Sequence, residues 1–127
     1  MSGKRLYGIR GATGVVNTAE SVMKETGNMC RMLFSKNALR PDDIVSIQFS
    51  VTGDVSAMNP ASALRHVDCG IDISSCALFC GVEPGVSGGL PHMIRILVTA
   101  YMPDGSVPCH IYMNGAEVLR PDFATVN

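Results

Sequence analysis

Three arginines stand in places where a charged side chain needs an explanation. Arg95 lies in the stretch HMIRILVTAYM (92–102), whose β-branched residues predict a strand. A guanidinium is permanently charged, and its burial in an apolar strand is costly unless an anion neutralises it. Arg10 lies between two glycines near a predicted strand end, and Arg120 lies in an apolar C-terminal segment. The planar fork of a guanidinium matches a carboxylate, so all three are candidates for binding an organic acid.

The partner of Arg95 has two interpretations. In the first, Arg95 pairs with an internal carboxylate such as Asp72 or Glu83, and the pair is structural. In the second, several arginines converge on a bound carboxylate ligand. Glu83 lies in a loop of glycine and proline close behind Cys80, so it suits either interpretation.

Motifs of other catalytic chemistries do not occur in the sequence. It has neither a G-x-S-x-G elbow nor the Cys/His/Asn signature of nucleophilic catalysis. The segment SGG (87–89) lacks the lysine and the spacing of a P-loop, and no G-x-G-x-x-G is present. Cys76 and Cys80 are spaced C-x3-C, but no second ligand pair accompanies them and the three histidines are scattered. We therefore predict no metal and no cofactor.

The composition favours a single domain over residues 1–127 and argues against several partners. Charged residues make up 17% and hydrophobic residues 46%, so we expect some apolar surface to be covered, most simply by copies of the same chain. The net charge is -1 and no basic run occurs, which argues against nucleic acid. No apolar run reaches the roughly 18 residues of a membrane span, and the N-terminus does not resemble a signal peptide. We expect a cytoplasmic protein.

The first half of the chain predicts a strand, a long helix and a second strand. RLYGIRGAT (5–13) indicates the first strand, and apolar residues at three- and four-residue spacings predict a helix from about 18 to 36. Asn17 or Thr18 can cap this helix, and Asn37 is expected to end it in a left-handed conformation. The next strand alternates strictly and is expected to present one apolar face, formed by Val45, Ile47, Phe49 and Val51.

The second half predicts one short helix and three more strands. Asn59 followed by Pro60 is typical of a helix start, and strands are expected near 71–79, 93–102 and 110–113. The predicted fold is therefore α+β: a mixed five-stranded sheet with one long and one short helix. One long helix can cover only one face of such a sheet, so the other face requires a partner.

Five short motifs resemble a known family. They are GIRGAT (8–13), EPGVSGGL (83–90), IR (94–95), HIY (110–112) and VLRPD (118–122). In this order and spacing, over about residues 5 to 122, they resemble the monofunctional chorismate mutases of the trimeric, pseudo-α/β-barrel type. The resemblance implies a homotrimer with its sheets facing a central core, its helices outside, and active sites at the subunit interfaces.

The resemblance implies conversion of chorismate to prephenate, a step of the shikimate pathway toward phenylalanine and tyrosine. This pericyclic (Claisen) rearrangement breaks and forms bonds within one substrate, so it needs no enzyme nucleophile, metal or cofactor. Negative charge develops on the ether oxygen in the transition state. A fixed cation beside that oxygen stabilises the transition state more than the ground state, and holding the enolpyruvyl arm over the ring contributes as well.

The matched motifs imply a role for each candidate residue. Arg95 would contact the ether oxygen and a substrate carboxylate. Arg10 would bind the side-chain carboxylate with help from the hydroxyl of Tyr112, and Glu83 and Cys80 would bind the ring hydroxyl. Arg95, Glu83 and Arg10 form the implied catalytic set.

Two more arginines and the tail complete the implied site. Arg65 and Arg120 would supply long-range or closing contacts to the ring carboxylate, and the tail 121–127 would be mobile and order over the ligand. Structural alternatives stay open for several residues. Tyr112 could be a packing aromatic, Cys80 a small buried hydrophobe, and Arg65 a solvated helix residue.

The sequence departs from the family at two positions. The family often carries an aromatic residue and a lysine where this sequence has Asn59 and Ser62. We expect weaker capture of the dianionic substrate, with the chemical step less affected. Two rival functions remain at this stage: a non-catalytic trimeric module that binds a carboxylate metabolite, and an enamine/imine deaminase, which GIRGAT and VLRPD fit poorly.

Overall fold

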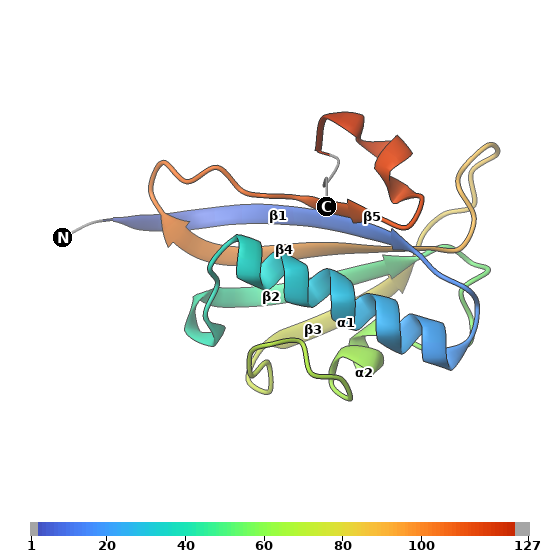
Figure 1. Cartoon of the computed structure of the whole chain (residues 1–127), viewed down its shortest axis with the longest axis horizontal. Helices are drawn as coiled ribbons and strands as arrows, with labels where there is room; N and C mark the ends of the chain where they lie inside the picture. Colours follow the sequence, from blue (N-terminus) through green and yellow to red (C-terminus); the bar gives the residue numbers. More distant parts are fainter. Residues whose placement is uncertain (1–2, 124–127) are drawn as a thin grey trace.

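The computed structural model describes residues 3–123, and it contains the predicted elements in the predicted order (Figure 1). The strands and helices are β1 (Lys4–Gly14), α1 (Ala19–Lys36), β2 (Ile44–Val51), α2 (Pro60–Leu64), β3 (Ala77–Val82), β4 (Met93–Pro103) and β5 (Ile111–Met113). Single 3-10 turns lie at Pro41–Asp43, Ala116–Leu119 and Pro121–Phe123. The mixed five-stranded sheet with two helices is confirmed.

The sheet is built around its longest strands. Its order is β3-β2-β4-β1-β5. The central strand β4 runs antiparallel to both β1 and β2, whereas the outer pairs β1–β5 and β2–β3 are parallel. In the β1–β4 and β2–β4 registers, Arg95 lies opposite Ala12 on one side and Ser50 on the other. Arg95 therefore occupies the middle of the sheet.

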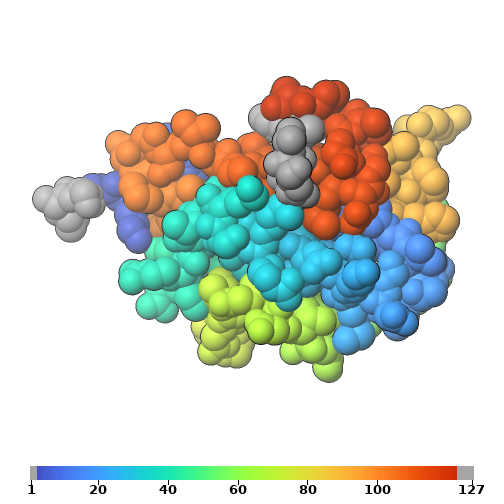
Figure 2. Space-filling view, in the orientation of Figure 1, coloured from blue at the N-terminus to red at the C-terminus, as the bar shows by residue number. Residues whose placement is uncertain are grey.

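Helix α1 lies along one face of the sheet, with α2 beside it (Figure 1). Thr18 caps α1 by accepting a hydrogen bond from the Ser21 N–H. The helix buries a stripe of apolar side chains against the sheet, where burial of one large side chain contributes about 1.5–3 kcal/mol. The core includes Met29, Leu33 and Phe34 of the helix. Figure 2 shows α1 and the α2 region covering this side of the molecule.

The opposite face of the sheet has no such cover among the described residues. Four large side chains on it are partly exposed: Leu6, Phe79, Leu97 and Tyr101, at 46%, 67%, 39% and 44%. Strands alternate their side chains, so the even-numbered residues of β1 and the odd-numbered residues of β4 point to this face. The prediction that this chain's helices cover only one face is confirmed.

Three local predictions were wrong. The third strand runs over Ala77–Val82 instead of near 71–79, because bends and turns occupy most of residues 71–76. Val45 does not join the buried face of β2, because the ladder with β4 is irregular between Ile44 and Ser46. This bulge turns Ile44 inward and leaves Val45 46% exposed. Asn37 has φ −103° and is not left-handed; Ala38, with φ 51°, takes that conformation instead.

Asn37 has a different role from the one predicted. Its amide donates to the carbonyl oxygens of Leu33 and Cys109 and accepts the Cys109 N–H at 2.7 Å. The side chain therefore ties the end of α1 to the segment that leads into β5. A buried amide satisfied on both sides is expected to fix this connection tightly.

The close approach of β1 to the turn after β5 generates a stability prediction. A Cβ at Gly14 would collide with the backbone carbonyl of Asn114, whereas one at Gly53 would meet nothing within 4 Å. We expect Gly14→Ala to lower the free energy of unfolding by about 1–3 kcal/mol, as overpacking does. Urea unfolding of Gly14→Ala and the control Gly53→Ala measures this. Equal stability of the two variants would contradict the close contact.

Candidate functional site

One cavity on the uncovered sheet face brings together three of the predicted residues. Arg10, Arg95 and Tyr112 line it from β1, β4 and β5. Its volume of about 470 Å³ is of the size that small-molecule sites have. Tyr112 is only 2% exposed and packs against Ala12, so its ring is held in place. Two guanidiniums on one cavity make it suited to an anion with more than one negative group.

Glu83 neutralises Arg95 in this chain. Arg95 Nε lies 2.9 Å from Glu83 Oε2, and the two side chains are 37% and 19% exposed. The Nε–H is buried but not aligned on an acceptor of the described chain, so the contact is an ion pair rather than a good hydrogen bond. Asp72, the other partner considered, instead accepts the Ser74 N–H at 2.9 Å. The structural pairing of Arg95 with Glu83 therefore exists, in the wall of an arginine-lined cavity.

A second cavity adjoins Arg95. It has a volume of about 500 Å³ and lies under the loop that follows β3, between Glu83 and Asp54. Asp54 accepts a hydrogen bond from the Thr52 hydroxyl at 2.6 Å and from the His92 N–H at 3.0 Å. These two donors hold the pKa of Asp54 below its usual value. The network fixes His92, directly before β4, which begins at Met93 two residues before Arg95.

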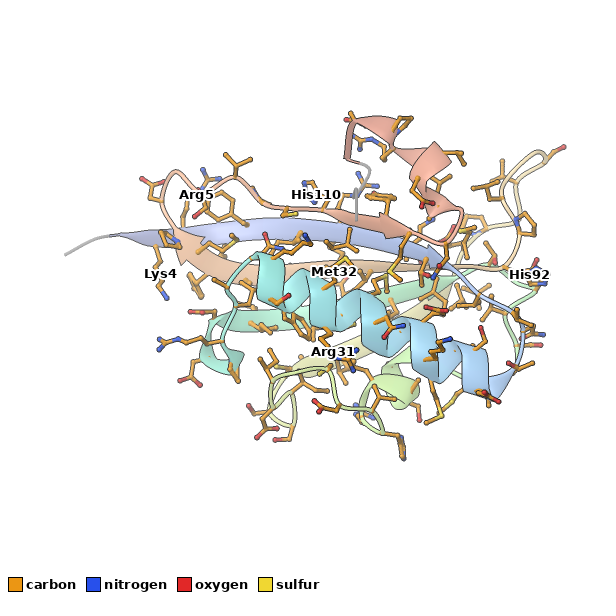
Figure 3. All side chains as sticks on the ribbon, in the orientation of Figure 1. Lys4, Arg5, Arg31, Met32, His92 and His110 are labelled. Carbon is orange, nitrogen blue, oxygen red and sulfur yellow. The ribbon has the colours of Figure 1, made fainter. Side chains whose placement is uncertain are left out.

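His110 lies directly before β5, the strand that pairs with β1, and it supports the backbone of Arg10. Its Nδ1 accepts the Arg10 backbone N–H at 2.9 Å, and Figure 3 shows His110 beside β1. Nδ1 therefore carries no proton, and the neutral ring has its hydrogen on Nε2. Burial, and then the charges of Arg10 and Arg120, lower the pKa of His110, while Asp122 acts in the opposite direction.

Arg120 lies near this site but is engaged in an ion pair. Its guanidinium contacts both carboxylate oxygens of Asp122, at 2.8 and 3.1 Å. Its charge also interacts with Tyr112, which lines the arginine cavity, and with His110, but Arg120 does not itself line that cavity. The tail 121–127 was predicted to close over the ligand. Residues 124–127 of this tail lie outside the described residues, so the closing movement stays a prediction.

Cys80 and Arg65 lie away from the arginine cavity. Cys80 is paired in register with Phe49, whose side chain points to the helical face. It lines a separate cavity of about 240 Å³ beside Asn59, and burial raises the pKa of its thiol. Arg65 caps the C-terminal end of α2 and lines another hollow together with Asp68. Within this one chain, Cys80 and Arg65 therefore lie apart from the residues of the arginine cavity, and each lines a different hollow.

Ser50 and His110 are site residues to which the sequence interpretation gave no role. Ser50 lines the cavity and donates to Glu83 at 2.7 Å, and His110 holds the Arg10 backbone. The strict alternation of IVSIQFSV placed Ser50 on the polar face of its strand, and HIY contained His110. Only the cross-strand register could have shown what each contacts.

No other chemistry competes with the arginine cavity in the described part of the chain. Residues 3–123 contain no group of three or more His, Cys, Asp or Glu side chains that could hold a metal ion. The same residues contain no helix with the length and apolar character to cross a membrane. The arginine cavity offers two guanidiniums, the Tyr112 phenol and the Ser50 hydroxyl, and the Glu83 carboxylate lines the adjoining cavity beside Arg95.

Comparison with known proteins identifies the family. The model of the family "Chorismate mutase type I" matches residues 6–123. This chain belongs to that family. It is 32% identical to the chorismate mutase AroH of Bacillus subtilis over 94% of this chain and 93% of the relative. It is 31% identical to the AroH of Thermus thermophilus over 91% and 94%.

A solved structure supports the same assignment. A chorismate mutase from Clostridium thermocellum superposes with a TM-score of 0.78 at 39% identity, covering 88% of this chain and 98% of that one. The resemblance inferred from the five motifs is thus confirmed, as are the chorismate mutase fold and the assignment to the isomerases. Neither the non-catalytic module nor the deaminase is supported by any of these matches.

The contact between His110 and Arg10 generates a pH prediction for this chorismate mutase. The folded state lowers the pKa of His110 from the ordinary value of 6.5. The unfolded chain therefore binds the proton first on acidification, and stability is lost as the pH falls below 6.5 toward the folded pKa. We expect His110→Asn, which keeps an acceptor without a titrating ring, to lose less stability between pH 7.5 and 5 than the wild type. Urea unfolding at fixed protein concentration measures the difference, and identical losses would contradict the prediction.

Proposed function

We propose that this chorismate mutase rearranges chorismate to prephenate at a site centred on Arg10, Glu83, Arg95 and Tyr112. The observation that carries this proposal is the pair of guanidiniums on one cavity, because the substrate is a dianion. Arg95 would lie at the ether oxygen, where negative charge develops. Arg10 would bind the side-chain carboxylate with the Tyr112 hydroxyl, and Glu83 would accept the ring hydroxyl.

The rearrangement requires nothing more from the protein than position and charge. No proton moves and no bond to the enzyme forms, so a fixed cation is the main catalytic device. Arg95 sits in the central strand and is held by its neighbours on both sides. Such a cation needs no rearrangement when charge appears on the substrate, which is the condition for stabilising the transition state selectively.

We propose that the complete site forms between subunits of a homotrimer. The four core residues lie on the uncovered sheet face, whereas Cys80, Arg65 and the two departing residues lie at β3 and α2. Two separate groups in one chain can meet if one subunit supplies the first and its neighbour the second. The exposed apolar side chains of the uncovered face supply a reason for the subunits to associate. Arg120 would add its charge from the edge of the first group.

The extent of the domain and the cellular localisation of the protein are two further proposals. We propose that residues 1–127 act as one catalytic domain whose last residues, from 121 onward, close over the bound substrate. We propose a cytoplasmic enzyme of aromatic amino acid biosynthesis that uses no metal and no cofactor.

Arg95 gives the first activity prediction. Arg95→Ala removes the cation at the ether oxygen, and loss of one such donor commonly reduces kcat by roughly 10²–10³-fold. The loss of the chorismate diene absorbance measures turnover. Arg95→Lys keeps the charge but not the fork, so its residual activity separates the two contributions. Arg40→Ala, at an exposed arginine outside both cavities, serves as the control. A change below tenfold in Arg95→Ala would reject the proposed role.

Ser62 gives a second activity prediction. The missing lysine makes the mouth of the site less positive, so we expect Ser62→Lys to raise kcat/KM several-fold, chiefly through KM. This gain should shrink as salt is added, because exposed charges are screened. Ser62→Met, of similar length but uncharged, is the matched control. A wild-type kcat/KM near the diffusion limit that Ser62→Lys does not change would contradict weak substrate capture.

A further inference from the structure

Ser50 lies where its hydroxyl can fix the position of the Glu83 carboxylate beside Arg95. It stands opposite Arg95 in the β2–β4 register and opposite Gly81 in the β2–β3 register. Its hydroxyl donates to Glu83 Oε2 at 2.7 Å, and Arg95 Nε lies 2.9 Å from the same oxygen. One carboxylate oxygen therefore serves two partners, and both partners come from neighbouring strands of the rigid sheet.

The second oxygen of Glu83 is left for another group. Among the described residues, no hydrogen bond reaches Oε1. The carboxylate lies beside the arginine cavity, whose lining includes Ser50 and Arg95. An ionised carboxylate accepts at both oxygens, so Oε1 is the atom available to a hydroxyl group of a bound molecule.

Without Ser50, the favoured arrangement of the pair would differ. A carboxylate next to a guanidinium tends to form a two-pronged pair, with both oxygens on the fork. The terminal torsion of a glutamate is broad, so little opposes that rotation. Such a pair would occupy Oε1 and would neutralise Arg95 more completely. In the observed geometry, the shortest contact joins Arg95 Nε to Oε2, no two-pronged hydrogen-bonded pair forms, and the Ser50 hydroxyl holds that oxygen.

We propose that Ser50 is a positioning residue, whose hydroxyl holds Glu83 so that Oε2 faces Arg95 and Oε1 faces the ring hydroxyl of the substrate. The inference rests on the proposed role of Glu83. Ser50 acts through Glu83 and does not itself touch the reacting atoms. It keeps the acidic partner from taking up the whole fork of Arg95, which the reaction needs as a cation.

The test compares single and double variants in the chorismate assay. We expect Ser50→Ala to lower kcat/KM roughly 10–100-fold, the loss typical of a hydrogen bond to a charged group. Ser50→Thr keeps the hydroxyl and should stay within about threefold of the wild type. In the Glu83→Ala background, Ser50→Ala should change kcat/KM by less than about twofold, because residues that act through one another are not additive. A loss of the same size in both backgrounds would overturn the proposal.

Ser46→Ala is the matched control for folding. Ser46 lies on the same strand and face as Ser50, and the structure gives its side chain no hydrogen bond to a described residue. It should keep wild-type activity and the same unfolding midpoint as Ser50→Ala. Equal unfolding midpoints show that a loss of activity in Ser50→Ala does not come from unfolding.

A crystal structure of Ser50→Ala separates this proposal from the proposed function. We expect both Glu83 oxygens to lie on the Arg95 guanidinium in that structure. An unchanged Glu83 would overturn the positioning role whatever the activity. Wild-type protein that leaves chorismate untouched would reject the proposed function, and a rotated Glu83 would then still support the effect of Ser50 on the pair.

Discussion

A guanidinium in the central strand is the constraint on which this structure depends. Arg95 interrupts an otherwise apolar strand, and its neighbours in sequence, Ile94 and Ile96, are buried on the helical face. The charge is tolerated because alternate residues of a strand point to opposite faces, so Arg95 points away from the core on the helical face. It is balanced by Glu83 at 2.9 Å. A cation held this way has little freedom, and that rigidity is what electrostatic catalysis requires.

The two faces of the sheet have different roles. The helical face holds the main core, including Met29, Leu33 and Phe34, and supplies most of the burial. The other face carries the arginine cavity and four partly exposed apolar side chains. The main core and the arginine cavity therefore lie on opposite faces of one sheet. Substitutions on the cavity face can alter the site without removing core side chains.

The elements of the fold were predictable because their signals are local. Helix spacing, the cap at Thr18, the Asn59–Pro60 start and the alternation of β2 all depend on neighbours in sequence. The bulge at Val45 was not predictable, since it arises from how two distant strands are paired. Ala38 in a left-handed conformation was missed because asparagine is the usual residue there, whereas Asn37 is drawn to Cys109.

The site was predictable in its residue types but only partly in its contacts. The arginines were conspicuous because a charged residue within an apolar stretch is unusual, and the motif resemblance assigned their roles. Ser50 on β2 holds Glu83, the partner of Arg95, and His110 before β5 holds the Arg10 backbone. Both are brought in by strand pairing across 33 and 100 residues of sequence. Side-chain partners at such separations leave no pattern in one sequence.

The cap of α2 limits how this enzyme can change. Asn59 stands where the motif resemblance led us to expect an aromatic ring, and here its side chain accepts the Ala61 N–H at 2.8 Å and begins the helix. Replacing such a cap commonly destabilises a helix by about 1 kcal/mol. Replacing Asn59 by an aromatic residue would remove this cap, so another residue would have to cap the five-residue helix. We expect a variant with an aromatic residue at position 59 to be less stable than the wild type, unless Pro60 or a neighbouring residue is changed first.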